Sequence, residues 1–136
     1  MNNRQTTLKE AIEISGVGLH TGLNVNMVLQ PAGTGHGYKF KRVDLEQQPI
    51  IQADCDLVVE VERGTTLEKN GAKIGTIEHL LAALVGCEVD NVLIEVDAPE
   101  IPIMDGSSAP FVEAIQNTGV IEQQAERQYL VIEENI

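Results

Sequence analysis

The chain has 136 residues, of which 43% are hydrophobic and 3% aromatic, and its 21 acidic and 9 basic residues give a net charge of −12. This length and composition predict one soluble domain with a mostly aliphatic core. The acidic balance argues against a nucleic-acid-binding protein, which needs a basic surface to displace counterions from phosphates. No apolar run approaches the roughly 18 residues of a membrane span, and the polar start MNNRQTT is not typical of a signal peptide. Cys55 and Cys87 form no CxxC pair, which favours reduced thiols in a cytoplasmic protein.

The first half of the chain predicts strands separated by glycine-containing turns. Alternating apolar residues indicate strands over 7–15 and 23–30, and the stretch SGVGLHTG between them indicates a loop. A turn over 31–37 leads to a third strand over 38–45, and one or two more strands are expected within 50–61. The basic cluster KFKR within the third strand is more simply a solvated strand face than a phosphate site.

The next segment predicts a hairpin, a helix and a buried strand. Residues 65–76 indicate a hairpin with its turn at Asn70-Gly71. A helix is expected from near Thr76 to Gly86. The stretch NVLIEV, residues 91–96, is apolar on both faces and therefore predicts a central strand.

The last segment predicts a second helix and then an exit from the domain. The helix should bury Phe111 and Ile115 and end near Gly119, with Ser107 or Ser108 as its N-cap. The polar stretch 122–128 is expected to be a linker. The apolar stretch 129–136 should be a strand or linker that enters a further domain, so that residues 1–128 form the domain itself. Strands outnumber helices, which predicts an α+β fold: a two-layer sandwich with two main helices on one face of a mostly antiparallel sheet.

The helix predicted within GTIEHLLAAL, residues 75–84, combines an ordinary apolar face with an unusual opposite face. The apolar arc comprises Ile77, Leu80, Leu81, Leu84 and Val85. The opposite side carries Glu78 and His79, followed by the small residues Ala82, Ala83 and Gly86, where a solvated helix would carry Lys and Glu. This pattern indicates that something packs closely or binds there.

By themselves, Glu78 and His79 are a weak signal for a metal site. A catalytic zinc ion usually has three protein ligands and one open position, and no HExxH, HxxEH, HxxxH or HxxxD pattern occurs in the sequence. His20 and His36 lie in glycine-rich loops without a partner at ligand spacing. The residues alone therefore favour a polar pair at a helix N-terminus, where Glu78 suits the helix dipole.

A family resemblance changes that interpretation. The stretches SGVGLHTG, GTIEHLLAAL and DNVLIEVDAPEIPIMDGSSAPFV, in this order, closely resemble the UDP-3-O-acyl-N-acetylglucosamine deacetylases, the zinc amidases of lipid A biosynthesis. The resemblance runs from about Thr7 to Phe111. It implies the N-terminal half of such an enzyme, with a fold similar to the second domain of ribosomal protein S5.

The resemblance implies a role for each member of the Glu-His pair. His79 matches the family's first zinc ligand and Glu78 its general base, which removes a proton from water as it attacks the acetamide carbonyl. The other ligands, a His and an Asp four residues apart, belong to the family's second domain. The chain is therefore expected to be inactive alone, to need its own C-terminal catalytic domain as partner and Zn²⁺ as cofactor, and to act on a UDP-sugar lipid substrate in the cytoplasm.

Four further residues are candidates for supporting roles. Leu19 and His20 lie in a loop that borders the active-site cleft in the family, and for His20 both substrate contact and a plain tight turn stay open. Thr65, in the stretch Arg63–Leu67 that leads toward the helix, is a candidate for lining the same cleft. Asp105, in IMDGSS, is interpreted as a structural residue that caps backbone N–H groups before the second helix.

Two other classes of function remain open. A small-molecule kinase of related fold would need a glycine-rich phosphate-binding loop that opens a helix, whereas GTGHG, residues 33–37, lies between predicted strands. A non-catalytic acidic interaction module would account for the net charge of −12 without using the Glu-His pair.

Overall fold

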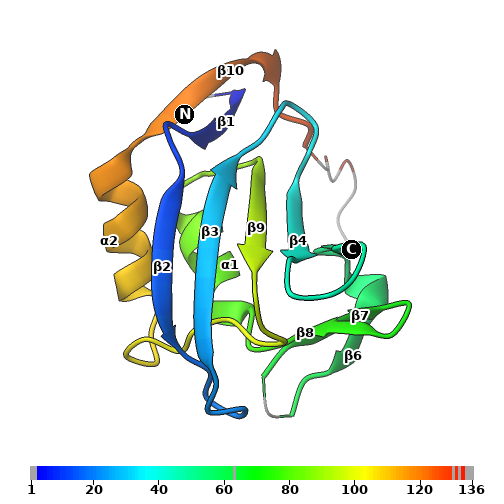
Figure 1. Ribbon diagram of the computed structural model, residues 1–136. Helices are drawn as coiled ribbons and strands as arrows, with labels where there is room; N and C mark the ends of the chain where they lie inside the picture. Colours follow the sequence, from blue (N-terminus) through cyan, green and yellow to red (C-terminus); the bar gives the residue numbers. More distant parts are fainter. Residues whose placement is uncertain (1–2, 63, 130, 132, 134–136) are drawn as a thin grey trace.

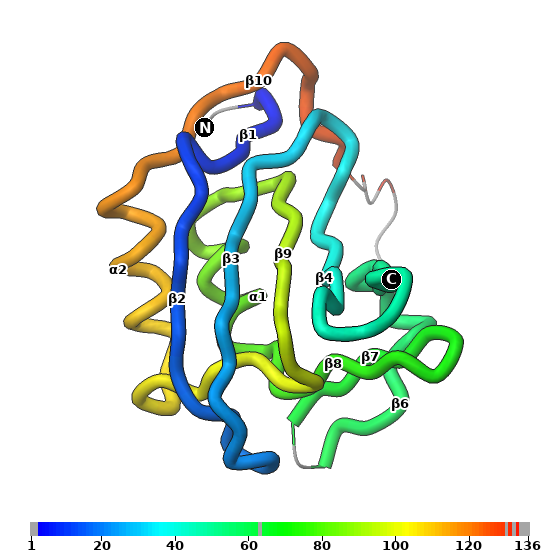
Figure 2. The backbone as a smooth tube through the Cα atoms, in the orientation of Figure 1, coloured from blue at the N-terminus to red at the C-terminus, as the bar shows by residue number. Residues whose placement is uncertain are grey.

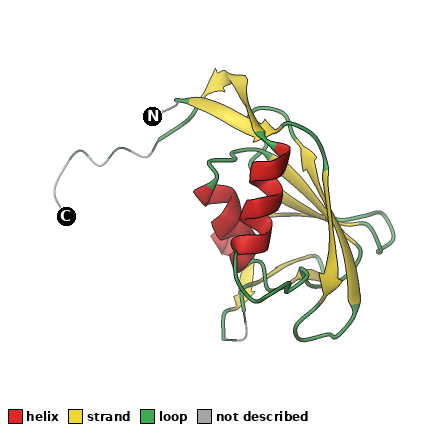
Figure 3. Cartoon of the chain, turned by 90° about the vertical axis from the view of Figure 1, so that its left-hand side faces the viewer, coloured by secondary structure: helices red, strands yellow, loops and turns green. Residues whose placement is uncertain are grey.

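The architecture is described from a computed structural model, in which residues 3–62, 64–129, 131 and 133 are placed well enough to describe. Helices α1 (Glu78–Gly86) and α2 (Ala109–Thr118) cover one face of a mostly antiparallel sheet (Figure 1). The view turned by 90° shows both helices on the same side of the strands (Figure 3). The predicted α+β fold is therefore confirmed.

The main sheet has five strands, with the central position occupied by β9 (Val92–Val96). Its order is β2 (Ile12–Val17), β3 (Asn24–Pro31), β9, β4 (Tyr38–Arg42) and β5 (Ile50–Gln52), of which the first four can be followed across Figure 2. Within this sheet, β4 and β9 run in the same direction and pair in parallel, whereas the other neighbouring pairs are antiparallel. The central strand predicted from NVLIEV is confirmed, although one face of β9 is fully buried and the other only half-buried.

Two smaller sheets flank the main one. Strands β6 (Val58–Glu60), β7 (Thr66–Lys69) and β8 (Ala72–Ile74) form an antiparallel sheet that follows a short 3₁₀ turn, η1 (Cys55–Leu57). Asn70 and Gly71 both have positive φ, 51° and 84°, as the two central residues of a type I′ hairpin turn require. The hairpin and its turn are therefore confirmed. Strands β1 (Arg4–Leu8) and β10 (Val120–Glu126) pair as a separate antiparallel ribbon.

The ribbon corrects two predictions. The strand expected over 7–15 is broken between β1 and β2, because residues 4–8 pair with β10 and residues 12–17 pair with β3. The linker expected over 122–128 is wrong up to Glu126, since these residues belong to β10. Backbone pairing with β1, rather than burial of an apolar face, holds this strand. Of the stretch 129–136, residues 130, 132 and 134–136 lie outside the described residues, and the other three belong to no regular element.

Arg42 corrects the interpretation of KFKR as a solvated strand face. Its side chain is 7% exposed and forms an ion pair with Asp44 at 2.8 Å. Its Nη1 also donates to the Lys73 carbonyl at 2.6 Å, which ties β4 to the end of the β7–β8 hairpin. The hydrogen-bonded guanidinium of Arg42 lowers the pKa of the Asp44 carboxyl. This arginine is therefore a buried structural cation.

The helices bury a largely aliphatic face against the sheet. Helix α1 contributes Leu80, Ala83 and Leu84 to the core, so Ala83 does not belong to the opposite side predicted for it. Val85 is 64% exposed and lies outside its predicted apolar arc. Helix α2 buries Phe111 and Ile115 as predicted and ends before Gly119. Its N-cap residue, Ser108, makes no side-chain capping bond. No helix in the described part of the chain is long and apolar enough to cross a bilayer.

Asn91 connects the β1–β10 ribbon to the main sheet. Its side chain is buried, its Oδ1 accepts from the Gly37 N–H at 2.9 Å, and its Nδ2 donates to the side chains of Gln5 and Gln123 at 3.0 and 2.8 Å. Its backbone carbonyl accepts from the Thr7 hydroxyl at 2.6 Å. A single side chain thus links β1, β10 and the start of β4.

Replacement of Asn91, the hub that links β1, β10 and the start of β4, should destabilise the fold. Asn91→Ala leaves the Gly37 N–H without its acceptor, and we expect the free energy of unfolding to fall by about 2 kcal/mol. Urea unfolding monitored by circular dichroism measures the change. Asn117→Ala, at an exposed position on α2, is the control and should change stability little. A loss below about 0.5 kcal/mol in Asn91→Ala would contradict the hub role.

Candidate active site

The start of α1 is fixed by backbone pairing on both sides. Gly75 donates to the Pro99 carbonyl at 2.9 Å and accepts from the Ile101 N–H at 3.1 Å. Two residues later, the Ile77 N–H donates to the Thr65 carbonyl at 3.4 Å. Between them, Thr76 has a φ of 59°, in the left-handed region. The chain therefore turns sharply into the helix at a position set by two neighbouring segments.

Glu78 is the first residue of α1 and is held through its carboxylate. Oε2 accepts from the Thr65 N–H at 2.9 Å. Oε1 lies beside Gly64, where a Cβ atom would be only 3.2 Å away. Gly64 also has a φ of 123°, which side chains rarely adopt. Thr65 thus contacts the predicted base through its backbone, and Arg63 lies outside the described residues.

His79 lies one residue further along the helix and is half-buried. Its backbone carbonyl accepts from the Ser108 hydroxyl at 2.8 Å, which joins the first turn of α1 to the start of α2. Asp105 is exposed, and its Oδ1 accepts from the N–H and the hydroxyl of Ser107 at 2.9 and 2.6 Å. These two bonds and the charge of His79 lower the pKa of the Asp105 carboxyl. The loop before α2 therefore brings Asp105 within electrostatic reach of His79.

The predicted substrate loop lies beside a pocket lined mostly by polar residues, called the polar pocket below. Leu19 is 57% exposed and His20 is exposed, at the turn between β2 and β3. The pocket has a volume of about 270 Å³ and is lined by His20, Thr21, Glu60, Thr66, Lys73, Gly75, Thr76, Pro99 and Glu100. Thr65 lines a separate cavity of about 190 Å³ on the other side of the β7 strand. The structure thus brings Glu78 and Thr65 together and places His20 in the neighbouring pocket wall.

Glu100 lines the pocket and was not predicted from the sequence. It is 3% exposed, and its carboxylate accepts hydrogen bonds from the His20 and Thr21 N–H groups and the Thr76 hydroxyl. Burial by itself would raise the pKa of this carboxyl, but these hydrogen bonds outweigh it and lower the pKa below its ordinary 4.5. The available signal was an acid inside the otherwise apolar run APEIPI.

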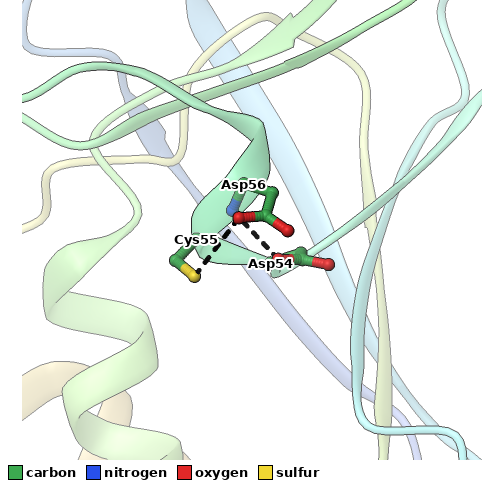
Figure 4. Close-up of side chains that lie close together, drawn as sticks. All are labelled: Asp54, Cys55 and Asp56. Atoms are coloured by element: carbon green, nitrogen blue, oxygen red, sulfur yellow. Dashed lines mark hydrogen bonds between the residues drawn. The ribbon is translucent and has the colours of Figure 1, made fainter.

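Within the described residues, one group of three side chains has metal-ligand spacing, and it is not the predicted pair. Asp54, Cys55 and Asp56 place their ligand atoms within 4.8 Å of one another (Figure 4). All three are exposed, and Asp54 accepts from the Asp56 N–H at 2.9 Å as the N-cap of the 3₁₀ turn. That capping bond accounts for the cluster. Glu78 and His79 offer one carboxylate and one imidazole, which is an incomplete donor set for zinc.

The fold and this geometry define a class of protein: an α+β domain with a carboxylate and an imidazole adjacent at the start of a helix, beside a polar pocket. The chain belongs to the LpxC family, UDP-3-O-acyl N-acetylglycosamine deacetylase, whose model matches residues 5–136.

Curated relatives agree with this assignment. The chain is 47% identical over 133 residues to the bifunctional enzyme LpxC/FabZ of Bacteroides thetaiotaomicron, covering 98% of this chain and 29% of that protein. It is 48% identical to the UDP-3-O-acyl-N-acetylglucosamine deacetylase of Xanthomonas oryzae pv. oryzae, covering 98% of this chain and 44% of the relative. The UDP-3-O-acyl-N-acetylglucosamine deacetylase of Myxococcus xanthus is 48% identical over 128 residues, covering 94% of this chain and 41% of the relative. The chain thus spans between 29% and 44% of the length of these relatives.

The lowered pKa of Glu100 predicts how its contribution to stability depends on pH. A carboxyl whose pKa is lower in the folded state than in the unfolded state stabilises the fold above its ordinary pKa of 4.5, and this contribution is lost as pH falls through the folded-state value. Glu100→Gln should therefore be less stable than the unmodified chain at pH 7, with a smaller difference at low pH. Urea unfolding of both proteins from pH 7 to pH 3 tests this, and a difference that grows on acidification would contradict it.

Proposed function

We propose that this chain is the N-terminal part of a zinc-dependent amidase that removes acetate from UDP-3-O-acyl-N-acetylglucosamine in lipid A biosynthesis in the cytoplasm. Family membership supports the reaction class. The observation that carries the residue assignment is the position of Glu78 and His79 in the first turn of α1, with the Glu78 carboxylate fixed by the Thr65 N–H at 2.9 Å.

Glu78 is the proposed general base. One carboxylate oxygen is occupied by the Thr65 N–H, so the side chain has a defined orientation. The other oxygen lies next to Gly64, which has no side chain to cover it. In the proposed reaction this oxygen accepts a proton from the water that attacks the acetamide carbonyl. Zinc, when bound, supplies Lewis-acid activation of that water and of the carbonyl.

His79 is the proposed zinc ligand from this chain. Its backbone is held by the Ser108 hydroxyl, which limits how far the first turn of α1 can move relative to α2. The remaining ligands are proposed to come from a C-terminal catalytic domain, with residues 129–136 leading into it and residues 1–128 forming the present domain. Ala82 and Gly86 are exposed on α1, and these two small residues suit close packing of that domain.

Leu19, His20 and Thr65 are proposed to border the substrate. The two loop residues are exposed beside the polar pocket, and Thr65 adjoins Glu78. Asp105 is proposed as a structural residue, since both of its hydrogen bonds shape the loop before α2. The kinase alternative gains no support, because residues 33–37 connect β3 to β4 and open no helix.

Removal of the base should abolish most turnover without removing the metal. In the complete enzyme that contains this chain, we expect Glu78→Gln to lower kcat at least about 100-fold while the zinc content stays unchanged. Steady-state kinetics and elemental analysis of the same sample measure both quantities. Glu113→Gln, on the exposed side of α2, is the matched control. Unchanged turnover in Glu78→Gln would contradict the assignment of Glu78 as the general base.

The proposed division of ligands predicts weak zinc binding by this chain alone. Calorimetric titration of the 136-residue chain with Zn²⁺ should show weak or no binding, because one imidazole and a neighbouring carboxylate do not complete a site. His79→Ala and Cys55→Ser are the controls. Tight 1:1 binding that is lost in His79→Ala would mean that the chain supplies further ligands, and binding lost only in Cys55→Ser would assign it to the Asp54–Asp56 cluster.

A further inference from the structure

Glu100 joins three segments that are distant in the sequence. Oε1 accepts from the His20 N–H at 2.9 Å and from the Thr76 hydroxyl at 3.0 Å. Oε2 accepts from the Thr21 N–H at 3.0 Å. Both carboxylate oxygens therefore accept hydrogen bonds. Oε2 accepts from the β2–β3 loop alone, and Oε1 accepts from this loop and from Thr76, two residues before α1. An apolar residue of similar size could fill the space but could accept none of these bonds.

The β2–β3 loop is built closely around this carboxylate. A Cβ atom on Gly18 would lie 2.5 Å from Glu100 Oε2 and 2.6 Å from the Thr21 hydroxyl, so no larger residue fits without displacing them. The loop closes on itself, since the Gly22 N–H donates to the Gly18 carbonyl at 3.0 Å. The N–H groups of His20 and Thr21, in the middle of the loop, both donate to the Glu100 carboxylate. The position of the β2–β3 loop therefore depends on the position of the Glu100 carboxylate.

Thr76 combines a strained backbone with a hydrogen bond to Glu100. Its φ of 59° is left-handed, which costs a β-branched residue about 1–3 kcal/mol. Its hydroxyl is buried and donates to Glu100. Glycine would adopt this backbone without strain but would lose the hydroxyl. The Thr76–Glu100 bond therefore links the entry of α1 to the wall of the pocket.

The three linked segments also form part of the pocket wall. His20, Thr21, Thr76 and Glu100 all line the cavity of about 270 Å³. We propose that Glu100 is a positioning residue, whose carboxylate fixes the loop Gly18–Thr21 against the entry of α1 and thereby sets the substrate-binding wall formed by Leu19 and His20. This inference rests on the proposed function, because it takes that loop to contact the substrate.

Glu100→Gln in the complete enzyme tests the proposal with two readouts. A neutral amide must turn its NH₂ group toward one of the two backbone N–H donors, which leaves that donor without an acceptor. We expect amide hydrogen exchange at His20 and Thr21 to accelerate at least about tenfold. We also expect KM for the UDP-sugar substrate to rise at least about tenfold with kcat changed much less, as loss of a binding wall requires.

Controls separate this role from general destabilisation and from the proposed function. Asp97→Asn removes another carboxylate that accepts a backbone N–H, that of Asn26 at 2.7 Å, and should alter neither readout. If Glu100→Gln does not fold, Thr76→Val serves instead, because it removes only the hydrogen bond from the Thr76 hydroxyl to Glu100. This variant should also raise KM, but by less than Glu100→Gln. Unchanged exchange at His20 and Thr21, or faster exchange with unchanged KM, would overturn the inference. An inactive wild-type enzyme would refute the deacetylase proposal, while the exchange readout would still test whether Glu100 fixes the loop.

Discussion

The position of strand β9 is the constraint on which the rest of the structure depends. Val92, Ile94 and Val96 are fully buried under the helices, and β9 is hydrogen-bonded to β3 on one side and to β4 on the other. Its register is thus fixed from both edges, and a slip by one residue would move three core side chains to the other face. Because β9 ends at Val96, the following loop must leave the sheet where Pro99 and Ile101 meet Gly75, and this contact places the start of α1.

Local patterns were sufficient to predict the elements that position the candidate site. Asn-Gly between two apolar strands specifies a hairpin turn, since both residues tolerate positive φ. The apolar run NVLIEV predicted the central strand, because apolar side chains on both faces are typical of a strand inside a sheet. The start of α1 was predicted to within two residues of Glu78. Periodicity alone gave Glu78 and His79 no function, and their roles came from the family resemblance and remain proposals.

Contacts between distant residues could not be predicted from the same patterns. Arg42 is buried because Asp44 and the Lys73 carbonyl satisfy its guanidinium, and the second partner is 31 positions away. Glu100 depends on N–H groups 79 and 80 positions earlier in the chain. Strand β10 is polar and mostly exposed, and only its pairing with β1, at the opposite end of the described chain, makes it a strand. Composition and local residue spacing do not indicate which distant residues will be hydrogen-bond partners.

The left-handed backbone at Thr76 has a consequence for efforts to engineer this domain. Glycine or asparagine at this position would relax the backbone, and a search for thermostable variants would favour such a change. The same change would remove the hydroxyl that meets Glu100 and free the entry of α1 from the neighbouring loop. Thermal tolerance and a well-ordered site thus compete for one residue. Stabilising substitutions are better placed in the β1–β10 ribbon, which lies outside the polar pocket.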